Sequence, residues 1–164
     1  MIVTDLSHEL IPRVQQLMGL GEPYIRVRTS SDYWLYARLF SSTCPVALVG
    51  DEVAGAVIAF RSQDDPRDVY IQDVITHPDH RKQGVARTLL AAIHHRAAAW
   101  GCSRLYLTSE PDNTTADATW TSLGFTNVPG DVLVHGVSVK RDFKGPGKDR
   151  AVYQLDLAPP LSRR

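Results

Sequence analysis

The sequence predicts an α+β fold, with a mixed, mostly antiparallel central sheet of about six to seven strands flanked by about four helices. Three observations predict it. The hydrophobic period switches several times between the helical value of about 3.6 and the strand value of about 2. The first two strand-like runs are joined by a short turn, which makes them antiparallel. A strand, a helix and a strand follow later in the order of one βαβ unit. This order differs from that of a repeated βαβ fold.

Two helical patterns open the chain. Apolar residues recur at three- and four-residue spacing in 7–20, where Pro12 is acceptable only in the first turn. In 31–41, Trp34, Leu35 and Leu39 fall on one face, and we expect Trp34 to pack into the core. Ser30 or Ser31 is the candidate N-cap of this second helix.

Strand-like runs and helices alternate after these patterns. The predicted strands, in order, are 46–49, 53–60, 69–76, 104–109, 125–128, 132–139 and 151–157. The turn Gly50-Asp51-Glu52 joins the first two as a hairpin. The clearest helix is 85–100, and a further helix at 114–123 follows the candidate cap Asn113.

Composition and charge narrow the function classes. The chain of 164 residues has 18 basic and 18 acidic side chains, so no excess of positive charge favours nucleic acid. No apolar run approaches the ~20 residues that cross a membrane, and we expect no membrane partner. Cys44 and Cys102 stand far apart, which favours two idle thiols in the reducing cytoplasm. The length predicts a single domain, 1–164, and leaves a homodimer open.

The most informative segment is Val74–Arg87, where a strand, a short polar loop and a helix follow one another. The first N–H groups of a helix lack internal partners, and the helix dipole adds partial positive charge there. Gly84 lets a ligand approach the backbone, and Ala86 keeps the next turn small. Arg81, Lys82 and Arg87 add full charges. This arrangement is typical of a pyrophosphate site, although the spacings of the Walker loop and of the dinucleotide fold are absent.

These residues resemble the GNAT superfamily, the GCN5-related N-acetyltransferases. Its signature Gln/Arg-x-x-Gly-x-Gly/Ala is matched by Arg81-Lys82-Gln83-Gly84-Val85-Ala86. A second block, Asn113-x-x-Ala116-x-x-x-Trp120-x-x-Leu123-Gly124-Phe125, is similar to the family's later helix. The resemblance implies the acyl-CoA N-acyltransferase fold, and an acetyl-CoA-dependent N-acetyltransferase that acts on a primary amine.

The resemblance also assigns the coenzyme site. The pyrophosphate of acetyl-CoA is expected on the backbone of the loop, and the pantetheine arm on the edge of the preceding strand. A backbone N–H near Val74 or Ile75 is the expected donor to the thioester oxygen. The implied coenzyme residues are Val74, Ile75, Thr76, Arg81, Lys82, Gln83, Gly84, Val85, Ala86, Arg87 and Asn113.

Two catalytic candidates follow. A primary ammonium must lose a proton before it attacks, and Asp73 is the sole acid on the strand before the loop, so it is expected to act as base or as partner of the substrate ammonium. A structural role for Asp73 stays open. Trp120 stands where many family members have an acidic Tyr, and an indole N–H is no useful acid. We expect Trp120 to shape the thioester pocket or to pack in the core, with Tyr106, Tyr153 or solvent supplying the proton.

The acceptor itself stays open. The resemblance implies that the first two helices help to wall the acceptor site, so Tyr33 and Tyr36 are candidate substrate contacts, and residues 30–76 are loosely similar to diaminobutyrate acetyltransferases. A small-molecule amine is expected; a protein or peptide amine, or a coenzyme A sensor without turnover, are the alternatives. His77 and His80 lack the partner set of a metal site, and no metal is expected.

Overall fold

The computed structural model describes residues 1–158 of the chain. A seven-stranded sheet in the order β1-β2-β3-β4-β5-β9-β6 forms the centre, and β7 and β8 pair separately. Only β4 and β5 are parallel; the other neighbours in the sheet are antiparallel. The strands are β1 (Ile2–Asp5), β2 (Pro45–Val49), β3 (Glu52–Arg61), β4 (Asp68–Thr76), β5 (Arg104–Ser109), β6 (Thr126–Asn127), β7 (Val132–Val134), β8 (Val137–Val139) and β9 (Ala151–Asp156). The predicted fold class is therefore confirmed, and the last six residues of the predicted domain 1–164 lie outside the described part.

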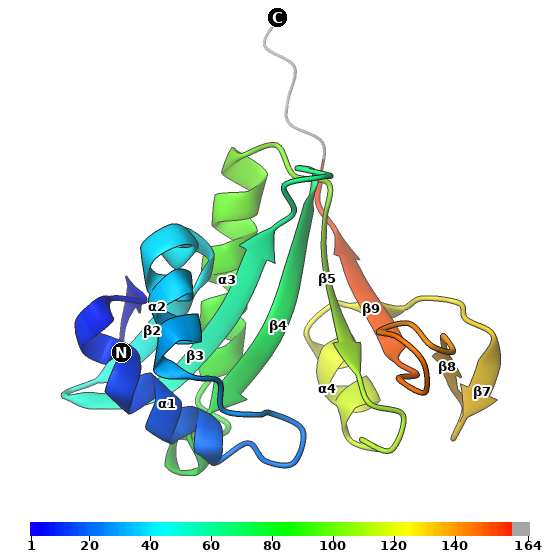
Figure 1. Cartoon of the computed structure of the whole chain (residues 1–164), viewed down its shortest axis with the longest axis horizontal. Coiled ribbons are helices and arrows are strands. Elements are labelled where there is room, and N and C mark those ends of the chain that lie inside the picture. The colour runs from blue at the N-terminus through cyan, green and yellow to red at the C-terminus, as the bar shows by residue number, and fades with distance from the viewer. Residues whose placement is uncertain (159–164) are drawn as a thin grey trace, which may run out of the picture.

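Helices cover both faces of the sheet (Figure 1). They are α1 (Ile11–Gly19), α2 (Ser30–Leu39), α3 (Val85–Ala99) and α4 (Ala116–Ser122). One apolar core lies under α3, which buries Val85, Leu89, Leu90, Ile93 and Ala97. The other core lies under α1 and α2 and contains Val14, Met18 and Tyr33. Each fully buried aliphatic side chain contributes about 1.5–3 kcal/mol, so the two cores together hold the sheet between the helix layers.

Several predicted elements need correction. β1 was missed by the pattern because it is a short edge strand. The helix predicted at 7–20 starts as the 3-10 turn η1 (His8–Leu10), and α1 begins only at Ile11 because Pro12 fits the first turn. The run 132–139 is two short strands around His135 and Gly136, both with positive φ.

The second helix differs in its cap and in its buried face. Thr29 caps α2, forming a capping box with Asp32, in place of Ser30 or Ser31. Trp34 is 48% exposed, and the core expectation for it was wrong. Tyr33 is the buried aromatic of this helix. In α4, Thr115 occupies the N-cap position that was predicted for Asn113.

The sheet opens between β4 and β5. The two strands pair only from Asp68↔Arg104 to Ile71↔Leu107 and separate toward their C-terminal ends (Figure 1). A β-bulge lies at the same point, because Ile58 pairs with Asp73 and Ala59 with Ile71, which leaves Gln72 unpaired. The bulge exchanges the two faces of β4: Ile71 packs into the α3 core, whereas Ile75 packs into the core of α1 and α2.

Within residues 1–158, no helix is long and apolar enough to cross a membrane. Cys44 and Cys102 are both buried free thiols, as the sequence predicted.

Candidate active site

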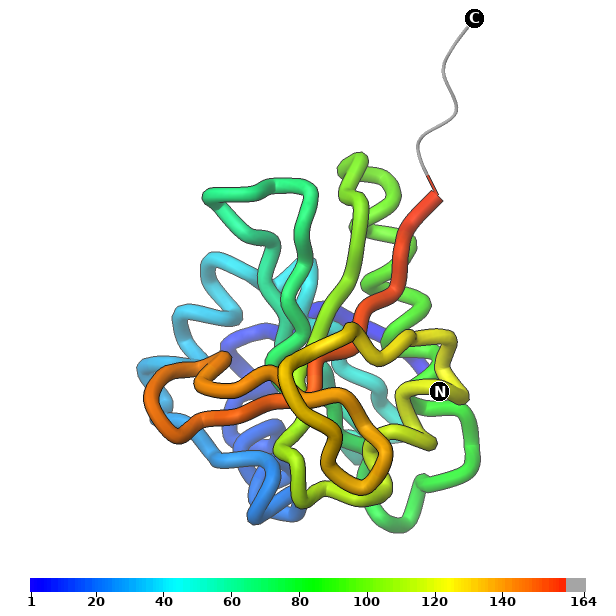
Figure 2. The backbone as a smooth tube through the Cα atoms, turned by 90° about the vertical axis from the view of Figure 1, so that its right-hand side faces the viewer, coloured from blue at the N-terminus to red at the C-terminus, as the bar shows by residue number. Residues whose placement is uncertain are grey.

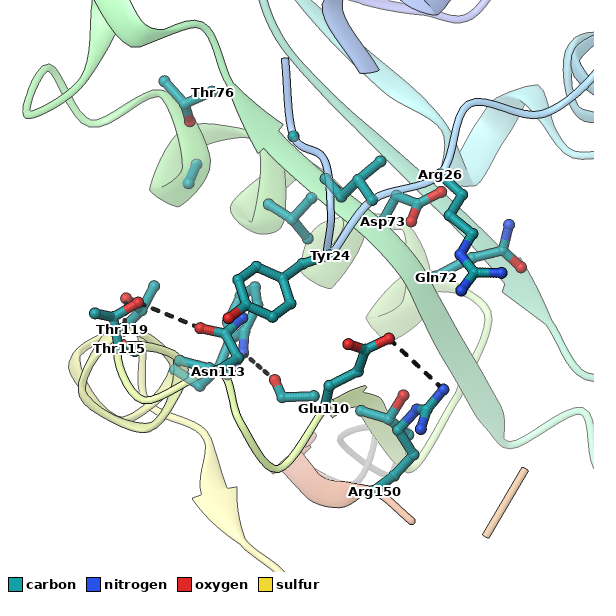
Figure 3. A pocket seen from close by; sticks show the side chains of 18 of the residues that line it. Tyr24, Arg26, Gln72, Asp73, Thr76, Glu110, Asn113, Thr115, Thr119 and Arg150 are labelled. Carbon is teal, nitrogen blue, oxygen red and sulfur yellow. Dashed lines mark hydrogen bonds and ion pairs between the residues drawn. The ribbon is translucent and has the colours of Figure 1, made fainter. Parts of the chain in front are cut away.

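A cavity of about 550 Å³ fills the opening between β4 and β5. Its walls come from the loop between α1 and α2, the second half of β4, the end of β5, the first turns of α3 and α4, and the segment between β8 and β9. Figure 3 shows Asp73, Arg26 and Gln72 toward one end of it, and Asn113, Thr115 and Thr119 toward the other. The cavity therefore places the carboxyl of Asp73, the edge of β4 and the first turns of α3 and α4 around one space.

The backbone of β4 offers free hydrogen-bonding groups to this cavity. His77 N–H donates to Ala54 C=O on β3 at 2.8 Å. Because backbone groups alternate along a strand, Ile75 also faces β3, and Val74 and Thr76 direct their N–H and C=O groups toward the opening. Both Val74 and Thr76 line the cavity. Of the two expected donors to a carbonyl oxygen, Val74 is the one that is placed to act.

The loop before α3 has the geometry of an anion site. Gly84 is the N-cap, with φ +76°, and nothing lies within 4 Å of where its Cβ would stand. Thr88 N–H donates to Gly84 C=O at 3.0 Å, so the N–H groups of Val85, Ala86 and Arg87 precede the first intrahelical bond. Lys82 also has a positive φ, +62°. The loop backbone is held in an uncommon conformation that exposes its amides.

The side chains of the loop have different surroundings. Arg81, Lys82, Gln83 and Arg87 are exposed, and Arg87 donates to Ser122 C=O at the end of α4 at 3.2 Å. Ala86 lines the cavity. Ile75 and Val85 are 6% and 2% exposed, and their side chains belong to the cores. Val85 can serve a ligand only through its backbone, whereas the backbone of Ile75 faces β3.

Two histidines connect this loop to the β2–β3 turn. His80 Nε2 lies 2.9 Å from a carboxylate oxygen of Glu52, an ion pair that raises the pKa of His80 and lowers the pKa of Glu52. His77 Nδ1 accepts from Asp79 N–H at 3.1 Å, which leaves its ring proton on Nε2, 3.6 Å from Glu52. Ligand atoms of Glu52, His77 and Asp79 lie within 4.8 Å of one another. The hydrogen bond and ion pairs above account for the closeness of these three side chains. The expectation that the protein binds no metal stays a prediction.

Asp73 is the buried acid of the cavity. Its exposed fraction is 7%, and its Oδ2 has no hydrogen-bond partner. Burial raises the pKa of Asp73, while Arg28, Gln72 and Lys144 oppose this rise. The pKa is therefore shifted toward neutrality, as a proton acceptor that works near pH 7 requires. Its burial in this cavity goes beyond what the strand pattern predicted.

Trp120 and Asn113 both line the cavity. The indole N–H of Trp120 donates to Ser109 Oγ at 3.0 Å, and its ring packs edge-on against Phe125. Ser109 ends β5, lines the cavity and is 8% exposed. It was missed because no motif marks it.

The two tyrosines named as alternative acids lie elsewhere. Tyr153 is 1% exposed and donates its hydroxyl to Asp117 at 2.9 Å, and burial together with this bond raises its pKa. Tyr106 stacks on Tyr70, and its pKa is also raised, chiefly by burial. Neither lines the cavity. Both candidacies are therefore disfavoured by the geometry.

The predicted acceptor residues Tyr33 and Tyr36 lie behind the cavity wall. Tyr33 is fully buried, and its hydroxyl has no partner. Tyr36 accepts a hydrogen bond from Gln72 Nε2 at 3.4 Å. The wall itself contains residues that the sequence pattern missed: Tyr24, Arg26 and Arg28 from the α1–α2 loop, and Lys144, Lys148 and Arg150 before β9. The alternation of basic and apolar residues in 24–28 was the available signal.

Similarity to known proteins agrees with this geometry. A curated L-2,4-diaminobutyric acid acetyltransferase of Nocardia farcinica is 32% identical over 85 residues, which are 52% of this chain and 44% of that protein, so the match spans less than half of the relative's length. A diaminobutyrate acetyltransferase of Paenibacillus lautus, solved with L-2,4-diaminobutyric acid and coenzyme A, superposes with a TM-score of 0.73 at 19% identity, covering 99% of this chain and 96% of that one.

Other solved structures share the fold. The yncA acetyltransferase of Salmonella typhimurium, solved with acetyl-CoA, has a TM-score of 0.71 at 18% identity and covers 100% of this chain and 98% of its own. The ribosomal-protein-S18-alanine N-acetyltransferase of Escherichia coli has a TM-score of 0.73 at 15% identity, with 99% of both chains covered. Residues 14–125, which include β4, the loop and α4, match the Acetyltransferase (GNAT) family as a whole. This chain therefore belongs to the GNAT acetyltransferase family.

Proposed function

We propose that the protein is an acetyl-CoA-dependent N-acetyltransferase that transfers the acetyl group to the primary amine of a small molecule by direct attack on the thioester. One observation carries this proposal: a single cavity joins the open edge of β4 to the buried carboxyl of Asp73, next to the start of α3, whose first amides have no intrahelical partner. A thioester lying along β4 would have its carbonyl beside that carboxyl.

The coenzyme would be held largely by backbone. The pyrophosphate would accept hydrogen bonds from the amides of 85–87, assisted by the charges of Arg81 and Lys82. The amide groups of the pantetheine arm would pair with Val74 and Thr76, as an added strand does at a sheet edge. Asn113 lines the cavity at the opposite wall.

The substrate ammonium would lose one proton to Asp73. The neutral amine nitrogen then attacks the thioester carbon and the C–S bond breaks. The second proton of the attacking nitrogen passes through solvent to the departing thiolate, so that the amide and the free thiol of coenzyme A are formed. The raised pKa of Asp73 makes it a stronger base than an exposed carboxylate, and Val74 N–H would stabilise the developing oxyanion. Burial of the site also strengthens both interactions.

Ser109 would assist the departing thiolate. Because Ser109 Oγ accepts the indole N–H of Trp120 at 3.0 Å, its own hydroxyl proton is free to point into the cavity. A hydroxyl of this kind stabilises a developing negative charge without transferring its proton. In this scheme Trp120 acts through Ser109 as a positioning residue.

The test is a panel of amines incubated with acetyl-CoA, with release of the coenzyme thiol as the readout. L-2,4-diaminobutyrate, diamines and a peptide with a free amino terminus represent the acceptor classes. We expect thiol release with small amines, and we expect Asp73→Asn to lower turnover while leaving the affinity for coenzyme A unchanged. Thiol release with the peptide alone would favour a protein acceptor. Coenzyme binding without release for any amine would favour a sensor.

A cytoplasmic location belongs to the same proposal. Two buried free thiols are typical of a reducing compartment, and the proposed co-substrate is an intracellular metabolite.

A further inference from the structure

Three buried polar atoms lack a hydrogen-bond partner in residues 1–158: Arg28 Nε, Tyr33 Oη and Asp73 Oδ2. Buried polar groups in native proteins are nearly always paired, so unpaired ones are expected to meet a ligand or water. Arg28 and Asp73 both line the cavity, and the charges of both act on the Tyr33 hydroxyl. Arg28 and Asp73 therefore share one site, the end of the cavity around Asp73, and the Tyr33 hydroxyl lies outside the cavity lining.

The unpaired atoms have opposite hydrogen-bonding character. Arg28 Nε can only donate, whereas a carboxylate oxygen of Asp73 accepts. The two side chains do not pair with each other, because no ion pair among the described residues joins them. A molecule that satisfied both would need an amine for Asp73 and an acceptor, best an anion, for Arg28.

The charge of the cavity wall also favours an anion. Five cationic side chains line the cavity, and Asp73 and Glu110 are its two acids. Glu110 lies 3.9 Å from Arg150 Nη2 (Figure 3), so this pair is internally balanced. The remaining cations Arg26, Arg28, Lys144 and Lys148 line the same cavity as one unpaired carboxyl, that of Asp73. A simple ammonium would be repelled by this wall unless it carried a compensating negative group.

Lys144 comes from the segment between β8 and β9. Residues 140–150 cross in front of the sheet between β8 and β9 (Figure 2), and Lys144 and Lys148 reach the same cavity as Arg28. Lys144 Nζ lies 5.2 Å from the ring of Tyr70 on β4, and its charge acts on Asp73. The segment thus completes the acceptor end with positive charge.

We infer that the acceptor carries a carboxylate in addition to the amine that is acetylated, and that Arg28 binds this carboxylate with Lys144 as the second cation. The inference rests on the proposed function and deepens it, because it assigns a substrate class to the unpaired atoms. It makes a peptide amino terminus, which has no carboxylate at that position, a poor acceptor.

The experiment compares acceptors that differ only in the carboxylate. L-2,4-diaminobutyrate, its carboxamide and its decarboxylated counterpart, propane-1,3-diamine, present the same terminal amine. We expect kcat/KM to be about 10- to 100-fold higher for the acid than for the other two acceptors. This factor corresponds to the stabilisation that one charge-assisted hydrogen bond provides. The same comparison with lysine and cadaverine tests a longer arm.

Two variants and one control locate the contact. Arg28→Gln should lower kcat/KM for the acid about 10- to 100-fold and leave kcat/KM for the diamine unchanged or slightly higher, because one repelling cation is removed, so that the preference disappears. Lys144→Gln should lower kcat/KM for the acid by only about 3- to 10-fold, because Lys144 is exposed and solvent screens its charge. Arg141→Gln removes a neighbouring charge that does not line the cavity, and it should retain the preference.

The outcomes separate the two proposals. Equal use of acid and diamine by the native protein, or an equal loss for both in Arg28→Gln, overturns the carboxylate site and leaves the acetyltransferase proposal standing. A rise in KM for acetyl-CoA in Arg28→Gln, with unchanged acceptor preference, would assign Arg28 to the coenzyme and also overturn it. Failure to acetylate any member of the panel overturns the proposed function together with the inference.

Discussion

Gly55→Ala is expected to loosen the junction on which the coenzyme site is built. Gly55 lies in β3, where a Cβ would stand 2.6 Å from Val85 Cγ1 and 2.9 Å from the backbone oxygen of Ile75. Contacts below 3.0 Å force a displacement. Ile75 O belongs to the strand ladder and Val85 is a β-branched residue in the first turn of α3, so neither can rotate away easily. The new methyl group must therefore push α3 away from the sheet.

The size of the effect follows from this overpacking. Inserting a methyl group into a packed core costs about 1–3 kcal/mol, and Leu89 Cδ1 at 3.2 Å adds to the crowding. For a chain of this length, a loss of about 2 kcal/mol lowers Tm by roughly 4–8 °C. Displacement of Val85 also moves the amides of 85–87, so coenzyme A should bind more weakly and raise Tm less than in the native protein.

Thermal unfolding with and without coenzyme A measures both effects. Gly19→Ala is the matched control, because its Cβ would meet only Val27 Cγ2, at 3.8 Å, and it should leave Tm nearly unchanged or slightly higher. Val85→Ala removes the closest contact. The double variant of Gly55 and Val85 should therefore lose less stability than the two single variants added, by at least about 0.5 kcal/mol. Strict additivity, or an unchanged Tm in Gly55→Ala, would refute the packing argument.

Four further predictions concern the site. No atom lies within 4 Å of a Cβ at Gly84, but its φ of +76° strains any side chain, so Gly84→Asp should keep the fold with a somewhat lower Tm. It should weaken coenzyme A binding by more than about tenfold in titration calorimetry; unchanged affinity would exclude the loop as the coenzyme site. Ser109→Ala should slow acetyl transfer by about 10- to 100-fold, with a smaller loss for a thioester of a more acidic thiol; equal losses would remove Ser109 from the leaving-group step. Because the pKa of Asp73 is raised, the folded state holds its proton longer, and stability falls as pH rises above 3.8. Asp73→Asn should therefore gain in Tm over the native protein as pH rises toward 7, and a constant difference would contradict this. Because the pKa of His80 is raised by Glu52, their ion pair stabilises the protein at low pH and is lost as pH rises through the raised pKa. Glu52→Gln should show its deficit in Tm between about pH 4.5 and the raised pKa of His80, with no deficit at pH 9.

The loop before α3 was predictable because its signals are local. The helix predicted at 85–100 is Val85–Ala99, and the cap Gly84 has the positive φ that its residue type favours. Amides at a helix start are unpaired wherever the helix lies, so the prediction of an anion site required no knowledge of distant residues. The hairpin around Gly50 and the clear helical stripe of α3 were predictable for the same reason.

The acceptor end depended on contacts between residues far apart in the chain. Whether Asp73 faces α2 or α3 is decided by the bulge at Gln72, which appears only when β4 pairs with β3. Arg28 and Lys144 are more than one hundred residues apart, yet they line the same cavity. A local pattern in the sequence carries no information about which distant residues come to line the same cavity.

The sequence by itself thus indicated the family through its resemblance to two motifs, and the mixed sheet through its periodicity. It also predicted a pyrophosphate site, from Gly84 and the unpaired amides at the start of one helix. Only the tertiary structure decided that Asp73 is buried, that Trp120 donates to Ser109, and that cations from two distant loops line the same cavity as one carboxyl. The burial of a side chain and the charges around it depend on all the elements packed against it. At this site those elements are brought together where β4 separates from β5.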